Sequence, residues 1–232
     1  MKISIVTPAH NEEENLPQLI NAIINLIRSM KWDAELVIVN DHSTDNTIKI
    51  VESYIAKYPG LIRLITRNDG RMGMGYTLIE GTREAKGDYV LWTMADRSDD
   101  IDTYPRIINA LKDYDMIFGS RYIKDGSRGD LEYNKAVASS TYSKLARFIF
   151  KLPVHDITNA FRGFKKEVFN KVKLVSGDFA ISPEFAIKAH LAGYKLGEVP
   201  TTYNNRKAGK TKFKMLKMGL RYASLFRYKF IK

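Results

Sequence analysis

The sequence of 232 residues contains no cysteine, which excludes disulfide bonds and metal sites built from thiolates. Its four histidines show none of the spacings that are typical of metal ligands. No stretch reaches the roughly 18 consecutive apolar residues of a transmembrane helix. Met1 leads directly into a strand-like run, without the apolar segment of a signal peptide. We therefore expect a protein that is cytoplasmic or attached to a membrane surface.

Acidic residues are missing from the C-terminal part of the chain, where Glu198 is the last of them. Ten of the 37 lysines and arginines lie beyond it and account for most of the formal net charge of +11. A basic block of this kind indicates a local anionic partner, such as phosphate, lipid headgroups or nucleic acid. Its members are Arg206, Lys207, Lys210, Lys212, Lys214, Lys217, Arg221, Arg227, Lys229 and Lys232.

The first half of the chain alternates between strand-like and helical patterns. Apolar runs predict strands at residues 3–6, 35–39, 61–65, 89–92 and 116–118, with helical periodicity between them. This alternation predicts βαβ units and an α/β fold with a mostly parallel sheet. The second half predicts helices at 134–150 and 182–191 and strands at 160–165 and 195–203. We expect one domain at 1–210 and a basic amphipathic helix at 211–232.

Polar residues follow the predicted strands, at the sheet edge where open α/β folds bind ligands. Carboxylates occur in three of these segments, at 7–14, 40–47 and 94–100. Grouped carboxylates repel one another unless they bind a cation or turn outward as helix caps. Asp45 and Asp100 are well placed as caps. Asp41 and Asp96 directly follow buried strands, which favours a binding function.

A diphosphate ligand would explain both carboxylates. An Mg²⁺ or Mn²⁺ ion held by one or two carboxylates binds a diphosphate and stabilises the charge that forms when it leaves. A carboxylate such as that of Asp41 also accepts hydrogen bonds from a nucleobase edge or from ribose hydroxyls.

Residues 6–17 read VTPAHNEEENLP and residues 39–47 read VNDHSTDNT. They resemble the first motifs of the family 2 inverting glycosyltransferases, and Asp96 occupies the place of the last acid in that family's DxD motif. Within the family, the sequence looks most like the polyprenyl- (dolichyl-) phosphate hexosyltransferases, such as the dolichyl-phosphate mannose synthases. It shares with them GSRY at 119–122, Gly163-Phe164, Glu184, Glu198-Val199-Pro200 and an R-x-x-G-x-S/T-K motif at 206–212. This resemblance spans nearly the whole chain and implies the GT-A fold, with a Rossmann-like central sheet flanked by helices.

The resemblance also implies a role for individual residues. Nucleoside binding falls to Pro8, His10, Glu12, Val39 and Asp41. Metal and diphosphate binding fall to Ala95, Asp96 and Ser98, with Asp96 as the metal ligand. Phosphate contacts fall to Arg121, Lys135, Arg206 and Lys212, of which the last two would close over the diphosphate. Asp96, Arg121 and Asp156 are the candidate catalytic residues.

The sequence departs from the family's pattern at three positions. Met94 replaces the first acid of the DxD motif, His10 replaces a Tyr, and Asn40 replaces the first acid of an Asp pair. We therefore expect metal binding that is weaker, differently organised or, in the extreme, absent.

Two further acids, Asp156 and Glu184, are candidates for the acceptor side. Asp156 could act as a base, or it could orient Arg121 or Arg162. A phosphate acceptor is already ionised and needs little help from a base.

The predicted C-terminal helix has an apolar face with Phe213, Leu216, Leu220, Ala223, Phe226 and Phe230 and a separate basic face. It could dock on the domain by its apolar face, or it could lie in a membrane interface with anionic lipid.

Three hypotheses follow for the function. The first is transfer of a hexose, mannose or glucose, from a GDP- or UDP-sugar to a polyprenyl (dolichyl) phosphate, with inversion, at the cytoplasmic face of the membrane. The second is the same fold with a saccharide acceptor. The third is a non-catalytic module that binds an anionic ligand. We expect no nucleic-acid partner, because the strand-end acids would repel a phosphate backbone and the aromatic pattern of common RNA binders is absent.

Overall fold

The computed structural model describes residues 2–205 and 215–230 of the chain. Its sheet has seven strands in the order β3-β2-β1-β4-β6-β5-β7, in which β6 alone runs antiparallel to its neighbours. The strands are β1 (Ile3–Ala9), β2 (Ala34–Asn40), β3 (Ile62–Thr66), β4 (Tyr89–Trp92), β5 (Met116–Ser120), β6 (Arg162–Lys165) and β7 (Leu196–Pro200). The mostly parallel α/β fold predicted from the alternating pattern is therefore confirmed.

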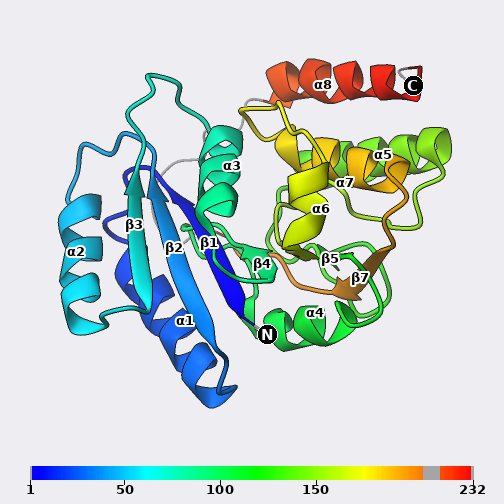
Figure 1. Cartoon of the computed structure of the whole chain (residues 1–232). Helices are drawn as coiled ribbons and strands as arrows, with labels where there is room; N and C mark the ends of the chain where they lie inside the picture. Colours follow the sequence, from blue (N-terminus) through cyan, green and yellow to red (C-terminus); the bar gives the residue numbers. More distant parts are fainter. Residues whose placement is uncertain (1, 206–214, 231–232) are drawn as a thin grey trace.

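Helices cover both faces of this sheet (Figure 1). The α-helices are α1 (Leu16–Ser29), α2 (Thr47–Lys57), α3 (Met74–Glu84), α4 (Tyr104–Ala110), α5 (Tyr133–Phe150), α6 (Lys166–Lys171), α7 (Ile181–Leu191) and α8 (Met215–Ser224). Two short 3-10 helices, η1 (Ile101–Thr103) and η2 (Leu225–Lys229), precede α4 and follow α8. The prediction did not include α6.

Side-chain alternation along the strands divides the interior into two cores. Ile3 and Ile5 of β1 lie with α1 and α4 in one core, whereas Val6 lies with α3 and α7 in the other. Both cores are apolar, so the sheet is buried on both faces, as parallel sheets usually are. This packing holds the carboxyl ends of β1, β2 and β4 side by side.

The caps at the starts of the helices agree only in part with the sequence prediction. Asp100 is the N-cap of η1, and its side chain accepts the N–H of Asp102 at 3.3 Å, as expected. Asp45 accepts the N–H of Thr47 at 2.9 Å, but the N-cap of α2 is Asn46, whose side chain makes no capping bond. Asn15 precedes α1, but its side chain donates to Glu12 Oε2 at 2.7 Å instead of capping the helix.

The C-terminal segment, α8 with η2, packs beside α5 through aromatic side chains. Tyr222 of α8 and Phe226 of η2 contact Tyr142 of α5, with ring centroids 4.8 and 5.5 Å apart. Met218 and Leu225 are also buried, whereas Leu220 and Phe230 are 77% and 85% exposed. The predicted apolar face therefore agrees with the docked face only in part. Phe226 contacts α5 as predicted, whereas Leu220 and Phe230 face away and the buried Met218 and Tyr222, which the apolar pattern left out, take part in the packing.

The structure places a helix and a 3-10 turn within the predicted helical tail, of which residues 211–214 and 231–232 lie outside the described residues. None of the helices at 2–205 and 215–230 combines the length and apolar character needed to cross a bilayer.

Candidate active site

A cavity of about 730 Å³ opens at the carboxyl ends of β1, β2 and β4. Nine of the twelve residues predicted to bind the ligand line it: Pro8, His10, Glu12, Asp41, Ala95, Asp96, Ser98, Arg121 and Lys135. Arg206 and Lys212 lie outside the described residues. The strand-end rule therefore points to the edge of the sheet at which this cavity opens.

Two predicted site residues lie outside the cavity wall. Val39 is fully buried in the core with Val6, because its position on β2 directs its side chain to the face covered by α3. Asp156 is fully buried as well, and it lies against Arg121.

The Asp41 carboxylate is held by three groups from neighbouring segments. Arg67 donates to it at 2.7 Å and the N–H of Gly73 at 2.8 Å, while His42 Nδ1 lies 3.3 Å away. The ring of His10 contacts the Asp41 carbonyl. A buried carboxylate with this many partners is fixed in orientation before any ligand arrives.

Arg67 is 6% exposed and was not among the predicted site residues. It directly follows β3, and so the same strand-end rule would have selected it. Its second nitrogen donates to Asp69 at 2.7 Å. Through Arg67, the segment between β3 and α3 folds back onto Asp41.

The turn after β4 presents two carboxylates to the cavity, those of Asp96 and Asp99. Asp96 accepts the N–H of Ser98 at 3.1 Å, and Asp99 Oδ2 accepts the N–H of Met94 at 2.8 Å and the hydroxyl of Thr93 at 3.2 Å. Burial and the nearby charge of Asp96 raise the pKa of Asp99 to about 7. The sequence pattern had assigned Asp99 no role.

These two carboxylates suit a hard divalent cation. Mg²⁺ and Mn²⁺ prefer oxygen ligands, and Mg²⁺ is usually held by one or two carboxylates together with substrate phosphates and water. Within residues 2–205 and 215–230, no group of three or more His, Asp or Glu side chains forms a metal site. The cation predicted for Asp96 would therefore need ligands from the diphosphate.

Arg121 and Asp156 form a bidentate ion pair beside the cavity. Nε and Nη2 of Arg121 lie 2.7 and 2.9 Å from the two carboxylate oxygens, and the Arg121 N–H adds a third bond at 3.2 Å. Burial alone would raise the pKa of Asp156, but the Arg121 charge outweighs it and lowers that pKa. An ionised carboxylate with these bonds is suited to orienting Arg121.

Arg162, the other predicted partner of Asp156, makes its hydrogen bonds elsewhere. Its guanidinium is fully buried and donates to the backbone carbonyls of Ser182, Ile157 and Asn159. Burial lowers the pKa of Arg162 to about 9. Because its bonds go to carbonyl oxygens, Arg162 holds the 157–162 segment in place and leaves Asp156 to Arg121.

Glu184 is a fully buried residue of α7 and does not line the cavity. Its carboxylate accepts the N–H of Ser176 at 2.7 Å, the amine of Lys188 at 2.5 Å and the hydroxyl of Tyr228 at 3.2 Å. These bonds join the loop before α7 to the C-terminal segment.

Apolar and aromatic side chains also line the cavity. They are Tyr142 of α5, Phe179, and Met218 and Tyr222 of α8. Arg121 and Lys135 line the same cavity, and Lys135 also donates to Glu132 at 2.8 Å. One continuous space therefore joins a carboxylate-bearing strand edge to an apolar wall.

The sequence profile of glycosyl transferase family 2 matches residues 4–173, which is most of the chain. The chain belongs to this family. The family predicted from the motifs is thus confirmed, and the enzyme class with it.

Curated relatives give the same assignment. The chain is 32% identical over 219 residues to a dolichol-phosphate mannosyltransferase of Pyrococcus furiosus, covering 92% of this chain and 60% of that protein. It is 26% identical to a polyprenol monophosphomannose synthase of Mycolicibacterium smegmatis, covering 90% of this chain and 79% of that protein. This chain therefore spans about three fifths of the length of the archaeal relative.

Among solved structures, a glucosyl-3-phosphoglycerate synthase from Mycobacterium tuberculosis, in complex with Mg²⁺ and UDP, superposes with a TM-score of 0.73. Identity is 15%, and the match covers 98% of this chain and 79% of that one. At this identity the likeness concerns the fold, and it agrees with the predicted GT-A arrangement.

Proposed function

We propose that this chain transfers a hexose, mannose or glucose, from a GDP- or UDP-sugar to a polyprenyl (dolichyl) phosphate at the cytoplasmic face of the membrane, with inversion at the anomeric carbon. The observation that carries the proposal is a cavity lined both by the strand-end carboxylates and by apolar and aromatic side chains of α5 and α8. A sugar nucleotide fits the carboxylate-bearing part, and a lipid phosphate requires the apolar part.

The donor end is supported by the chemistry of its walls. Asp41 is pre-oriented to accept hydrogen bonds from the nucleoside, and Asp96 faces the place where the diphosphate would bind. Solved structures with this fold contain UDP with Mn²⁺ or Mg²⁺. When bound, the cation would neutralise the charge of the departing nucleoside diphosphate.

The acceptor end is supported by Arg121 and by the apolar wall beyond it. The bonds to Asp156 occupy Nε and Nη2 of Arg121, which leaves Nη1 for a phosphate oxygen. Tyr142, Met218 and Tyr222 then provide a surface for the first prenyl units. Relatives named for dolichol and polyprenol phosphates agree with this assignment.

The transfer needs little acid–base chemistry from the protein. An oxygen of the acceptor phosphate attacks the anomeric carbon, and the bond from that carbon to the diphosphate breaks with its electrons going to the leaving oxygen. The acceptor is already ionised, so no base has to remove a proton. The contribution of Arg121 is electrostatic, because it holds the attacking phosphate close to the donor. Asp156 acts through Arg121 as a positioning residue.

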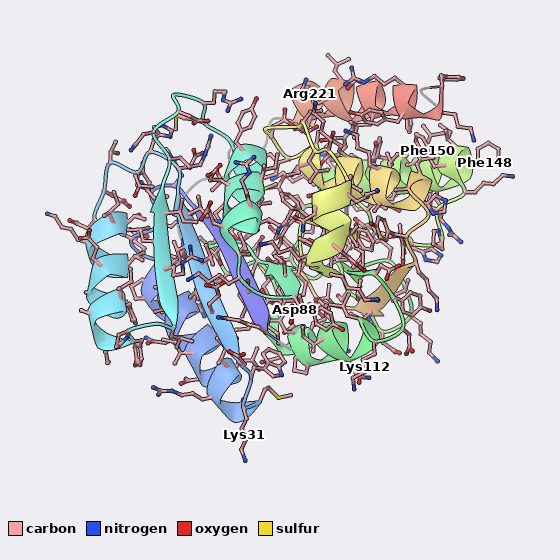
Figure 2. The ribbon with its side chains drawn as sticks, viewed as in Figure 1. Lys31, Asp88, Lys112, Phe148, Phe150 and Arg221 are labelled. Atoms are coloured by element: carbon pink, nitrogen blue, oxygen red, sulfur yellow. The ribbon has the colours of Figure 1, made fainter. Side chains whose placement is uncertain are left out.

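Membrane attachment is supported by large apolar side chains that are exposed on α5, on α8 and just after η2, namely Leu145, Phe148, Leu220 and Phe230. Figure 2 shows Phe148, which is 84% exposed, pointing away from the body of the molecule near the end of α5. Lys144, Arg147 and Lys151 surround it in a shallow groove. Apolar side chains among basic ones are suited to an interface with anionic lipid.

A transfer assay tests the proposal directly. Purified protein with Mn²⁺ would be offered GDP-mannose, UDP-glucose and related donors with a short-chain polyprenyl phosphate in detergent, and with soluble saccharides in parallel. We expect transfer to the polyprenyl phosphate with one donor, and loss of at least about 100-fold in Asp96→Ala, because one electrostatic contact to a transition state is worth 10²–10³ in rate. Asp102→Asn, at an exposed position, serves as the control.

Two results would contradict the proposal. Transfer to saccharides and not to the lipid phosphate would favour the second hypothesis. Full activity in Asp96→Ala would remove Asp96 from the donor site.

A further inference from the structure

The turn after β4 contains a carboxylate in an unexpected place. Asp99 lies five residues beyond Met94 in the sequence, yet its Oδ2 accepts the Met94 N–H at 2.8 Å. The turn thereby brings an acid to the backbone of position 94, where the side chain itself is apolar. Thr93 adds a second bond to the same oxygen at 3.2 Å.

The Asp99 carboxylate belongs to the same cavity as Asp96. Both side chains line it together with Arg121, whose charge acts on the Asp99 carboxyl group in the opposite sense to that of Asp96. Both of these bonds to Asp99 use Oδ2, which leaves Oδ1 without a hydrogen bond to the described residues. Two neighbouring carboxylates in a partly buried wall repel each other, and a divalent cation between them removes that repulsion.

We infer that Asp99 is a second metal-ligating carboxylate. It binds the divalent cation together with Asp96 and substitutes for the DxD acid that Met94 replaces. The inference rests on the proposed function, because the cation is the one that accompanies the sugar nucleotide. Asp96 and Asp99 then supply two oxygen ligands, and the diphosphate and water supply the others. The prediction of Asp96 as the single metal carboxylate is thereby extended.

Asp99 could instead only shape the turn, and the Asp99→Asn variant separates the two roles. The asparagine carbonyl oxygen can accept the Met94 and Thr93 bonds, so the turn is retained. The negative charge is lost, however, and with it most of the attraction to a cation. Asp99→Ser, which replaces the carboxylate with a smaller neutral side chain, is a second variant with the same loss of charge.

Metal binding is measured without any transfer reaction. Free Mn²⁺ would be quantified by electron paramagnetic resonance during titration of each protein in the presence of UDP, and separately of GDP. We expect Asp99→Asn and Asp99→Ser to weaken Mn²⁺ binding by about 10-fold or more, as two-ligand sites depend on each carboxylate. Asp102→Asn, which changes the charge of an exposed aspartate by the same amount, should bind Mn²⁺ like the wild type.

The inference is overturned if either Asp99 variant, with a thermal melting temperature like that of the wild type, binds Mn²⁺ within twofold of it. It is also overturned if the wild type binds no Mn²⁺ with either nucleotide. Mn²⁺ binding that depends on Asp99, combined with no transfer to polyprenyl phosphate, would contradict the proposed function and leave the role of Asp99 standing.

Discussion

Arg121 and Asp156 show how a single pair of residues can matter for stability and for function at once. Both side chains are nearly or fully buried, and each neutralises the other. Asp156→Asn leaves the Arg121 charge without its counterion, so we expect a loss of about 3–5 kcal/mol in the free energy of unfolding. Urea unfolding of the two proteins measures this difference.

The double variant Arg121→Met with Asp156→Leu separates stability from function at the same site. Replacing a buried ion pair by apolar side chains is often neutral or stabilising. We therefore expect the double variant to recover most of the stability that Asp156→Asn loses and yet to transfer no sugar. Substantial transfer by this protein would exclude Arg121 from the reaction.

Among the elements, β2 joins its neighbours through the buried carboxylate of Glu35. Ser4 donates to it from β1 at 2.6 Å, the N–H of Lys86 from the turn before β4 at 2.6 Å, and Arg63 from β3 at 3.1 Å. Burial raises the pKa of Glu35, but these donors together lower it below its ordinary value of 4.5. The unfolded chain then binds more protons than the folded one in acid.

The stability supplied by Glu35 is therefore complete above about pH 4.5 and is lost as the pH falls through the lowered pKa. We expect Glu35→Gln to be less stable than the wild type at pH 7, and the difference to shrink as the pH is lowered toward 3. Urea unfolding across this range measures it. A difference that stays constant would show that the charge of Glu35 is not the cause.

Helix α3 approaches β1 and β2 closely at Gly81. A Cβ atom at this position would lie 2.5 Å from Val6 Cγ1 and 2.7 Å from Val39 Cγ2. We expect Gly81→Ala to destabilise the protein by about 1–3 kcal/mol through overpacking, despite the better helix propensity of alanine. In α8, a Cβ atom at Gly219 would have nothing within 4 Å, so Gly219→Ala should be neutral or stabilising by up to about 1 kcal/mol. Thermal unfolding compares the two.

At the scale of the whole molecule, the end of α5 presents the exposed Phe148 (Figure 2) together with the basic residues Lys144, Arg147 and Lys151. We expect binding to vesicles with anionic lipid, and weaker binding as the salt concentration rises toward 1 M, where the screening length falls to about 3 Å. Flotation with anionic and with neutral vesicles measures it.

Phe148→Ser should reduce this binding several-fold, because a large exposed apolar side chain is lost from the basic end of α5. Met30→Ser is the matched control, since Met30 is also exposed but lies at the end of α1, beside Lys31 and far from α8 in Figure 2. Equal binding by the two variants would place the membrane contact elsewhere.

Much of the fold and one edge of the site were predictable from sequence, for a local reason. Hydrophobic alternation depends on neighbouring residues, so it located the strands and most helices, and the parallel sheet followed from their order. Asp41 and Asp96 were found because both follow buried strands. Helix α6 was missed because it is only six residues long and has little periodicity.

Tertiary structure decided which residues contact one another across segments that are distant in the chain. The choice of Asp156 between Arg121 and Arg162 depends on how β5, β6 and the 156–162 segment pack, which no local pattern contains. The same is true of Arg67 on Asp41 and of the docked face of α8. The sequence by itself determined the family, the order of the elements and the carboxylates at the sheet edge. Only the folded chain shows that Asp99 accepts a hydrogen bond from the Met94 N–H, because the conformation of the turn decides which side chain reaches that backbone group.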